Sequence, residues 1–325
     1  MNQLLDHHSL FPFIVGCGRS GTTLLTVMLD SHPELAIPGE SGKLIIQTCR
    51  QFPPTDQSAH RRRFTNEQAT AIVDGLFASH RFRAWQLDRD QLILHLIRHQ
   101  VSTGSDVVRT ILALYALKEG KVRFGDKTPS HVLHMPYLAT TFPESVFIHV
   151  IRDGRDVALA LLDASFGPTT VESAATYWTH RVQTGRRAGR SLGPRRYLEV
   201  HYEHLITDPE VVLRNVTRFL RLDYDPLMLQ YIDASQRQLN MSPAPAEDES
   251  LTRPLTHGLR DWRVQMKPVD IATFDLLAAK LIDQLGYQVG QNHLPPRVIG
   301  EGVIRAARET LRWRWDRLTC RTPTW

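Results

Sequence analysis

Short apolar runs alternate with amphipathic segments along the chain. The runs at 11–16 (FPFIVG) and 146–151 (VFIHVI) have the continuity and length of buried strands, and 122–125 and 196–200 are typical of shorter ones. Apolar residues recur at helical spacing from Leu24 to Leu29, directly after the first strand. The same spacing predicts further helices at 66–79, 90–101, 105–118, 130–141, 156–164 and 171–188.

The order of these elements indicates the fold class. Asp208 and Pro209 start one more helix, with Asp at the N-cap and Pro in the first helical position, and 240–256 is the clearest irregular segment. Strands that alternate with helices are typical of a parallel sheet covered on both faces. The sequence therefore predicts an α/β fold, a three-layer domain with a central parallel sheet flanked by helices.

Composition narrows the class of protein. Apolar residues make up 42% and charged residues 22% of the 325 residues, which is ordinary for a globular chain and excludes a disordered one. Three scattered cysteines do not form a disulfide framework or a Cys-rich zinc site, and we expect no metal site. Residues 1–10 lack the pattern of a signal peptide and no stretch is apolar enough to span a membrane, so we expect a cytoplasmic location.

The net charge of +5 is concentrated near the C-terminus. Residues 297–325 contain seven arginines and three acids, so the rest of the chain is nearly neutral and we expect no nucleic-acid partner. We divide the chain into a domain at 1–290 and a basic, helical C-terminal extension at 291–325. Apolar residues recur at helical spacing through 297–318, so this helix docks on the domain, contacts an anionic membrane, or binds a partner.

A glycine-rich loop follows the first strand. Residues 16–23 (GCGRSGTT) have the outline of a Walker A loop, but Thr22 stands where that loop has its lysine. Glycines let the backbone wrap, and N–H groups at a helix N-terminus favour an oxyanion. Because the lysine is missing and Arg19 is the cation in the loop, we expect it to hold a single phosphate, with the transferred group beside Arg19, and not a magnesium-bound triphosphate.

Four segments carry a family resemblance. FPFIVGCGRSGTTLLTVMLDSHPEL resembles the 5′-phosphosulfate loop of sulfotransferases that use 3′-phosphoadenosine 5′-phosphosulfate (PAPS), and it is most similar to tyrosylprotein and carbohydrate sulfotransferases. VFIHVIRDGRDVALAL resembles the 3′-phosphate motif of the family. GDKTP at 125–129 and VHYEHL at 200–205 are weaker matches. The matches run in the family's order from residue 11 to about 222 and again near Trp262, and they imply a P-loop-type α/β domain.

The resemblance implies a set of donor-binding residues. The loop residues would hold the 5′-phosphate: Gly18, Arg19, Ser20, Gly21, Thr22 and Thr23. Thr22 and Thr23 could also cap the helix. Arg152 would bind the 3′-phosphate, with Arg155 either contributing or pairing with Asp153 or Asp156 on the surface.

The later donor motifs depart from the family in one place. The family has a serine where this chain has Ala160, so we expect Tyr202 as a replacement donor to the 3′-phosphate. Arg253 and Arg260 lie in a segment that resembles the family's lid over the nucleotide. Trp262, close behind them, is predicted to belong to the core.

The resemblance also implies the catalytic residues. Counted from Arg19 without gaps, Glu40 stands where tyrosylprotein sulfotransferases have a catalytic glutamate. It could act as general base with a pKa raised by partial burial, or it could be an exposed acid near a helix start. Lys127 follows a predicted strand, and the family's matching lysine lies next to the sulfonate and the leaving oxygen. Arg19 would stabilise the departing phosphate.

These residues favour a sulfotransferase that moves a sulfuryl group from PAPS to a hydroxyl of a small-molecule, glycan or lipid acceptor and releases adenosine 3′,5′-bisphosphate (PAP). Two alternatives remain open at this point, a P-loop kinase and a nucleotide-binding module without catalysis. Thr22 in the lysine position opposes the first, and the joint presence of Glu40 and Lys127 opposes the second. The donor motifs do not identify the acceptor or the oligomeric state.

Overall fold

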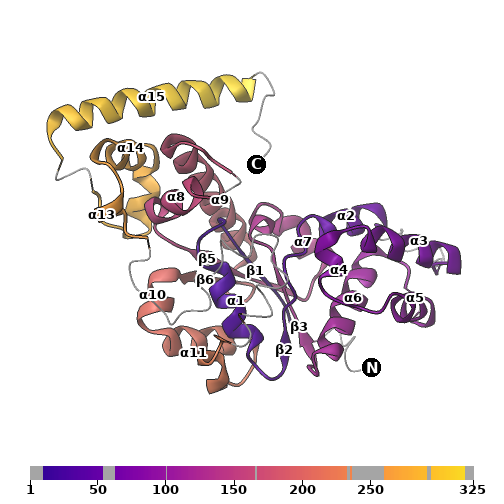
Figure 1. Cartoon of the computed structure of the whole chain (residues 1–325). Helices are drawn as coiled ribbons and strands as arrows, with labels where there is room; N and C mark the ends of the chain where they lie inside the picture. The colour runs from indigo at the N-terminus through magenta and orange to yellow at the C-terminus, as the bar shows by residue number, and fades with distance from the viewer. Residues whose placement is uncertain are drawn as a thin grey trace.

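A four-stranded parallel sheet forms the centre of the computed structural model (Figure 1). The strand order is β4–β1–β5–β6, with β1 at Phe11–Gly16, β4 at Asp126–Lys127, β5 at Ser145–Ile151 and β6 at Tyr197–His201. The predicted α/β class with a central parallel sheet is confirmed. The residues that the structure describes are 10–53, 63–99, 101–164, 167–232, 235, 260–290 and 294–318, with side chains only to 312 in the last range.

Helices cover both faces of the sheet. Successive side chains of β1 and β5 point to opposite sides, and because both sides are apolar, each must be packed against helices. Phe13 and Phe147 pack into one hydrophobic cluster, and their neighbours Ile14 and Ile148 pack into another. The first face is covered by η1 (Pro129–Leu133), α7 (Met135–Thr141) and α9 (Val171–Leu192). The second is covered by α1 (Thr22–Asp30), α10 (Tyr202–Thr207) and α11 (Pro209–Leu220), with η2 (Pro226–Leu229) beside them.

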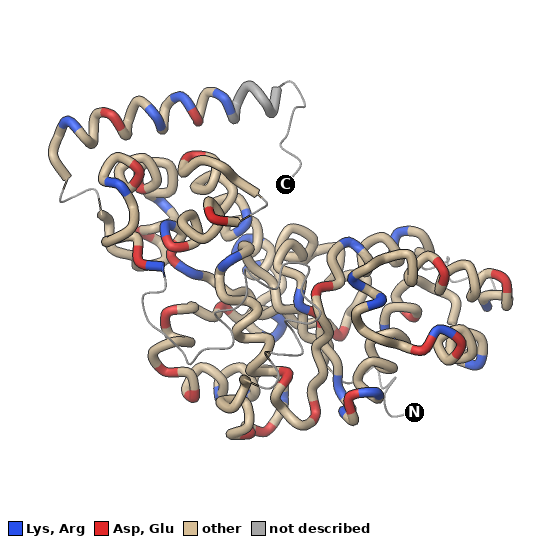
Figure 2. Tube along the Cα trace, in the orientation of Figure 1, with Lys and Arg blue, Asp and Glu red and all other residues tan. Residues whose placement is uncertain are grey.

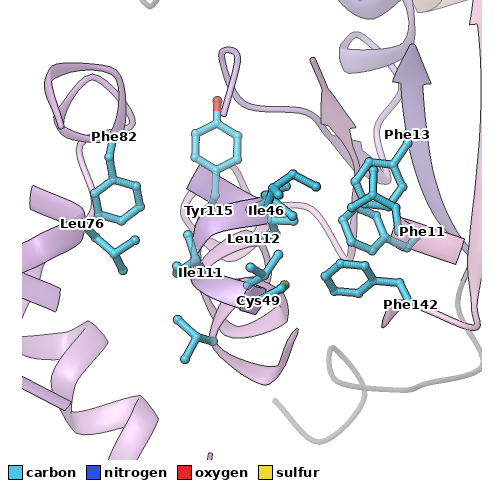
Figure 3. Packing of buried hydrophobic residues seen from close by; sticks show 14 of the residues in the cluster. Phe11, Phe13, Ile46, Cys49, Leu76, Phe82, Ile111, Leu112, Tyr115 and Phe142 are labelled. Atoms are coloured by element: carbon cyan, nitrogen blue, oxygen red, sulfur yellow. The ribbon is translucent and has the colours of Figure 1, made fainter. Parts of the chain in front are cut away.

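A group of helices extends the first cluster away from the sheet. It contains α2 (Leu44–Gln51), α3 (Asn66–Phe77), α4 (His80–Arg83), α5 (Arg89–Arg98) and α6 (Gly104–Lys118). Figure 3 shows the aromatic rings of Phe11, Phe13 and Phe142 together at the sheet, with Tyr115 and Leu112 on the neighbouring helix. The ring centroids of Phe11 and Phe142 lie 5.2 Å apart, edge to face. One continuous core therefore joins these helices to β1.

The C-terminal helices pack beside α9. They are α13 (Trp262–Gln265), α14 (Pro268–Gln284) and α15 (Pro296–Leu318), and α8 (Gly154–Leu162) lies between them and the sheet. In Figure 1, α15 runs along α14. Arg305 of α15 forms ion pairs with Glu172 of α9 and Asp270 of α14. The predicted extension is therefore docked on the rest of the chain through one side of its helix, while the boundary at 290 stays a prediction.

Several predicted elements differ in detail. The strand expected at 122–125 is shorter, β3 (Arg123–Phe124), and it pairs with β2 (Leu35–Ala36) instead of the main sheet. Residues 126–127, which follow it, form β4 in the main sheet. The helix expected at 130–141 is divided at His134 into η1 and α7. The prediction that a helix starts with Asp208 at its N-cap and Pro209 in the first helical position is confirmed, and the Asp208 side chain forms no cap hydrogen bond there.

Among the described residues, none of the helices combines the length and the apolar character needed to cross a membrane. Within the same residues, Cys17 and Cys49 are buried free thiols.

Candidate active site

The glycine-rich loop joins β1 to α1 and has a fixed backbone conformation. Arg19 and Gly21 both have positive φ, 67° and 90°. A Cβ added to Gly21 would lie 2.2 Å from the ring of Tyr202, so a side chain has no room at this position. The loop therefore depends on glycine both for its conformation and for the close approach of Tyr202 from α10.

The loop has hydrogen-bonding groups that no described residue uses. Ser20 is completely buried, and its Oγ has no hydrogen-bond partner in the described part of the chain. Helix α1 starts at Thr22 with Gly21 as its N-cap, so neither threonine caps it, and no side chain caps its N-terminus. The first N–H groups of a helix have no partner inside the helix. A buried hydroxyl and uncapped N–H groups at one helix end form a cradle that fits a phosphate.

Lys127 lies at the carboxyl end of β4, which pairs with β1, and its side chain reaches the start of α1. Its Nζ lies 2.8 Å from Oε1 of Glu40 and 3.3 Å from Oγ1 of Thr23. Only 5% of the Lys127 side chain is exposed. Three residues that are far apart in the sequence and predicted to share a site are therefore in contact.

Glu40 is held by two cations. Arg81 from α4 lies 3.4 Å from Oε2 of Glu40, on the side away from Lys127. Burial pushes the pKa of Glu40 upward, but the charge and hydrogen bond of Lys127, together with Arg81, outweigh it and hold the pKa below its ordinary value. The expectation of a raised pKa is wrong because it left out the ion pair. Glu40 is therefore a carboxylate, ready to accept a proton, across the neutral range.

A buried hydrogen-bond network positions the segment that carries Glu40. His131 donates through Nε2 to the Gly42 carbonyl, and its Nδ1 lies 2.9 Å from a carboxylate oxygen of Asp126. Ser41 and Thr128 join the same two segments through their hydroxyls, which are 2.9 Å apart. His131 and Asp126 are both buried. The network fixes residues 41–42 against the strand that ends at Lys127, so the Glu40–Lys127 geometry is preorganised.

Arg152 marks a second cationic position at the end of β5. Its guanidinium lies 4.4 Å from the centroid of the Tyr202 ring, and its Nη2 is 3.6 Å from Oδ2 of Asp156. The Nε of Arg152 is buried and has no hydrogen-bond partner among the described residues. Because Tyr202 contacts both Gly21 and Arg152, it joins the two predicted phosphate positions. Burial raises the pKa of Asp156 to about 6, against the opposing charge of Arg152.

Arg155 has a structural role. It is completely buried, where it pairs with Asp153 at 2.8 Å and Asp275 at 3.0 Å and stacks on the ring of Trp262 at 3.6 Å. The alternative that it pairs with an acid on the surface is therefore wrong about the surface and right about Asp153. Trp262 is buried, as expected for a core residue.

The remaining predicted residues lie near Arg152 or outside the described chain. The carbonyl of Arg260 accepts a hydrogen bond of 3.4 Å from Arg152, while its side chain pairs with Asp163 at 2.6 Å. Ala160 is buried in α8 and offers no hydroxyl. Arg253 lies outside the described residues. Among those that are described, no cluster of three or more metal-ligating side chains occurs.

Two residues at the site have no signal in the sequence. Arg81 is one of many arginines in the chain, and only the packing of α4 brings it to Glu40. Tyr177 of α9 lies beside the loop, with its hydroxyl 3.8 Å from the Cβ position of Gly18 and the Arg181 guanidinium 3.4 Å from its ring centroid. Burial raises the pKa of Tyr177 to about 12, so it stays a neutral hydrogen-bonding group. Helical periodicity alone places Tyr177 only in a helix.

Comparison with known proteins agrees with this geometry. The profile of the sulfotransferase family matches residues 13–226. The chain is 23% identical over 303 residues to protein-tyrosine sulfotransferase A of Caenorhabditis elegans, covering 89% of this chain and 69% of the relative. It is 24% identical over 294 residues to protein-tyrosine sulfotransferase 1 of Danio rerio, covering 87% and 73%.

Two solved structures share the fold. The sulfotransferase domain from the curacin biosynthetic pathway superimposes with a TM-score of 0.59 at 20% identity, over 86% of this chain and 99% of that domain. The sulfotransferase domain of the Synechococcus PCC 7002 olefin synthase has a TM-score of 0.54 at 20% identity, over 89% and 98%. The family match sets aside the kinase and the non-catalytic module. The chain belongs to the sulfotransferase family and is an enzyme with PAPS as its sulfuryl donor.

Proposed function

We propose that this enzyme transfers the sulfuryl group of PAPS to a hydroxyl acceptor, with Glu40 as the general base and Lys127 and Arg19 as the cations that stabilise the leaving phosphate. The observation that carries the proposal is the position of Lys127, whose Nζ contacts both Glu40 and Thr23. One ammonium group thereby touches a potential base and the start of the phosphate cradle, which are the two ends of an in-line transfer.

The residues present fit the donor. The 5′-phosphate would be held by the N–H groups of the first turn of α1 and by the hydroxyls of Ser20, Thr22 and Thr23. Arg152, with its unused Nε, would hold the 3′-phosphate, with Tyr202 next to it in place of the missing serine. Gly18 and Gly21 belong to the loop that would wrap the phosphate, and Arg260 lies beside Arg152. Arg253 stays a prediction. When bound, the donor supplies a sulfuryl group attached to a phosphate that can leave.

The chain's own groups then divide the work of the transfer. The Glu40 carboxylate accepts the proton of the acceptor hydroxyl as that oxygen bonds to sulfur. The bond from sulfur to the bridging phosphate oxygen breaks, and its electron pair stays on that oxygen, where the charges of Lys127 and Arg19 stabilise it. The products are a sulfate ester and PAP. In this proposal the charges of Lys127 and Arg19 stabilise the leaving oxygen, so the step uses groups of the protein alone.

The acceptor is a hydroxyl of a small molecule, a glycan, a lipid or a protein. The first three are the acceptor classes that we expected when we read the sequence, and the names of the relatives add the tyrosine hydroxyl of a protein. A transfer assay with radiolabelled PAPS separates them when a tyrosine peptide, a phenol, a glycan and a lipid alcohol are tested side by side. Incorporation into the tyrosine peptide alone would reject the three acceptor classes that we inferred from the sequence.

The role of Glu40 is tested by Glu40→Gln, with Glu67→Gln on the exposed start of α3 as the matched control. We expect Glu40→Gln to abolish turnover while the dissociation constant for PAP, measured by calorimetry without metal, changes by less than about threefold. Turnover retained by Glu40→Gln would reject the base assignment. Tighter binding of Mg²⁺ and ATP than of PAP would reject the donor site itself.

The cytoplasmic location and the division of the chain at residue 290 also stay predictions.

A further inference from the structure

The outer side of α15 is a surface that the proposed function does not use. The inner side is packed, since Ala306 is buried and a Cβ added to Gly302 would lie 2.8 Å from Cβ of Ala272 in α14. Arg305 ties the same side to Glu172 and Asp270. The helix is therefore anchored by one side, and its orientation on the protein is fixed.

The outer side is apolar along its middle. Val303, Ile304 and Leu311 are 48%, 54% and 65% exposed, values high for large aliphatic side chains. Ile304, Ala307 and Leu311 are spaced by three and four residues, so they form one stripe. The sequence continues this spacing at Trp315 and Leu318, and the helical backbone continues to Leu318. A helix of this length is about 35 Å long, so the stripe is extended.

Arginines border the stripe. At 100° per residue, Arg308 and Arg312 lie on one side of it, and both are exposed. Glu301, the acid nearest the exposed stripe, pairs with Arg297. Figure 2 shows basic positions recurring along α15, which lies at one edge of the molecule where a flat surface can approach it. The outer side of the helix thus combines an apolar strip with a positive border.

We propose that this outer side of α15 binds an anionic phospholipid membrane, with the stripe in the headgroup region and the arginines on lipid phosphates. An amphipathic helix with arginines beside an exposed aliphatic stripe has the composition of helices that lie in the interface plane. A second copy of this chain fits less well. Two such helices paired on the stripe would bring their bordering arginines close together, where like charges repel. Glu301, the described acid nearest the stripe, is already paired with Arg297.

Vesicle flotation of the full-length protein tests the proposal. We expect co-flotation with vesicles of phosphatidylcholine and phosphatidylserine, and at least tenfold less with phosphatidylcholine alone. Leu311→Asp should abolish it, and Arg308→Glu should weaken it at least fivefold, since each basic residue near an anionic surface contributes about that factor. The matched controls are Val211→Asp, at 67% exposure, and Arg214→Glu, both on the exposed side of α11.

PAP affinity and circular dichroism establish that each variant is folded. A loss of flotation with unchanged PAP affinity therefore concerns membrane binding and not the donor site. Three outcomes overturn the proposal. The first is equal flotation of intact protein and Leu311→Asp. The second is equal flotation on both vesicle types. The third is a concentration-dependent dimer that Leu311→Asp dissociates, observed by light scattering, because it would assign the stripe to a second copy.

Discussion

The two ends of the donor site hold phosphate by different means. At the 5′ end, the loop before α1 offers backbone N–H groups and the buried hydroxyl of Ser20, and its shape depends on Gly21. At the 3′ end, a single guanidinium, that of Arg152, sits on the ring of Tyr202 beside Asp156. Binding at the 5′ end therefore depends on a backbone conformation, and binding at the 3′ end depends on the charge of one side chain.

Because the two ends bind phosphate by different means, substitutions should weaken nucleotide binding differently at each end. A backbone cradle is lost as a unit when its conformation is blocked, whereas a charged side chain can be removed with little change in fold. Loss at the 5′ end should therefore affect every nucleotide with a 5′-phosphate. Loss at the 3′ end should affect only nucleotides that carry a 3′-phosphate.

The largest effect is expected from Gly21→Ala. The new Cβ would lie 2.2 Å from the Tyr202 ring at a φ of 90°, so the loop and Tyr202 must both move. We expect PAP and 5′-AMP to lose affinity together, by about a hundredfold or more, because the cradle is shared. Isothermal titration calorimetry of both nucleotides measures this loss.

Gly18→Ala is the matched control for that change. Its Cβ would meet only the Tyr177 hydroxyl, at 3.8 Å, which is ordinary contact. We expect its PAP affinity to stay within about threefold of the parent, because neither sterics nor φ oppose the alanine. If both alanine variants bind PAP like the parent, the 5′ end does not depend on the conformation of the loop, and the proposed difference between the two ends is wrong.

Lys127→Met should lower kcat by about 10²- to 10³-fold, the usual cost of removing one group that stabilises developing charge. It should also move the acid limb of the pH profile. Lys127 is the main reason that the pKa of Glu40 lies below its ordinary value, so without it burial prevails and the pKa rises. The base is then lost at a higher pH, and the acid limb of kcat/KM shifts upward.

The pH profile distinguishes this role from simple misfolding. Lys121→Met is the control, because Lys121 is bound to Asp30 and the Leu35 carbonyl, away from Glu40. An acid limb at the same pH in Lys127→Met and the parent would show that Lys127 does not set the protonation of Glu40. In that case the contact of Lys127 with Glu40 does not contribute to catalysis through the protonation of Glu40.

Arg152→Met tests phosphate binding at the 3′ end alone. A hydrogen bond to a charged group contributes about 1.5–3 kcal/mol, so PAP affinity should fall about 10- to 100-fold. The affinity for 5′-AMP should change less than threefold, because the cradle at α1 is intact. Arg187→Met, on α9, is the control for removing a surface arginine. An equal loss for PAP and 5′-AMP would place Arg152 at a different part of the nucleotide.

Local motifs and tertiary contacts differ in how far the sequence reveals them. The strand, loop and helix around Gly21 are contiguous, and the conformational demand on glycine is visible in the residues themselves. Arg152 follows an apolar run that predicts a strand, so the sequence places it at the carboxyl end of that strand, where the carboxyl ends of parallel strands meet. These features of the fold and the site were predicted because short-range rules determine them.

Contacts across the fold were not predictable in the same way. The pKa of Glu40 was expected in the wrong direction because its direction depends on the 2.8 Å contact with Lys127, 87 residues away. Arg81 and the hydrogen bond of His131 to Gly42 depend on how α4 and η1 pack. No periodicity encodes such pairs, and a chain rich in arginine gives no reason to select Arg81.

The smallest effect is expected from Asp156→Asn, and it tests whether the 3′ end is governed by charge alone. Because the pKa of Asp156 is raised to about 6, the carboxyl is ionised at pH 7.5 and opposes a phosphate at Arg152, and it is mostly neutral at pH 5.5. Asparagine keeps the oxygen that accepts the Trp262 N–H. The variant should bind PAP about threefold tighter than the parent at pH 7.5 and equally at pH 5.5. Titration of the phosphate itself affects both proteins alike, so the ratio of their calorimetric affinities isolates Asp156. A ratio that does not change between the two pH values would mean that Arg152 binds phosphate without competition from its neighbour.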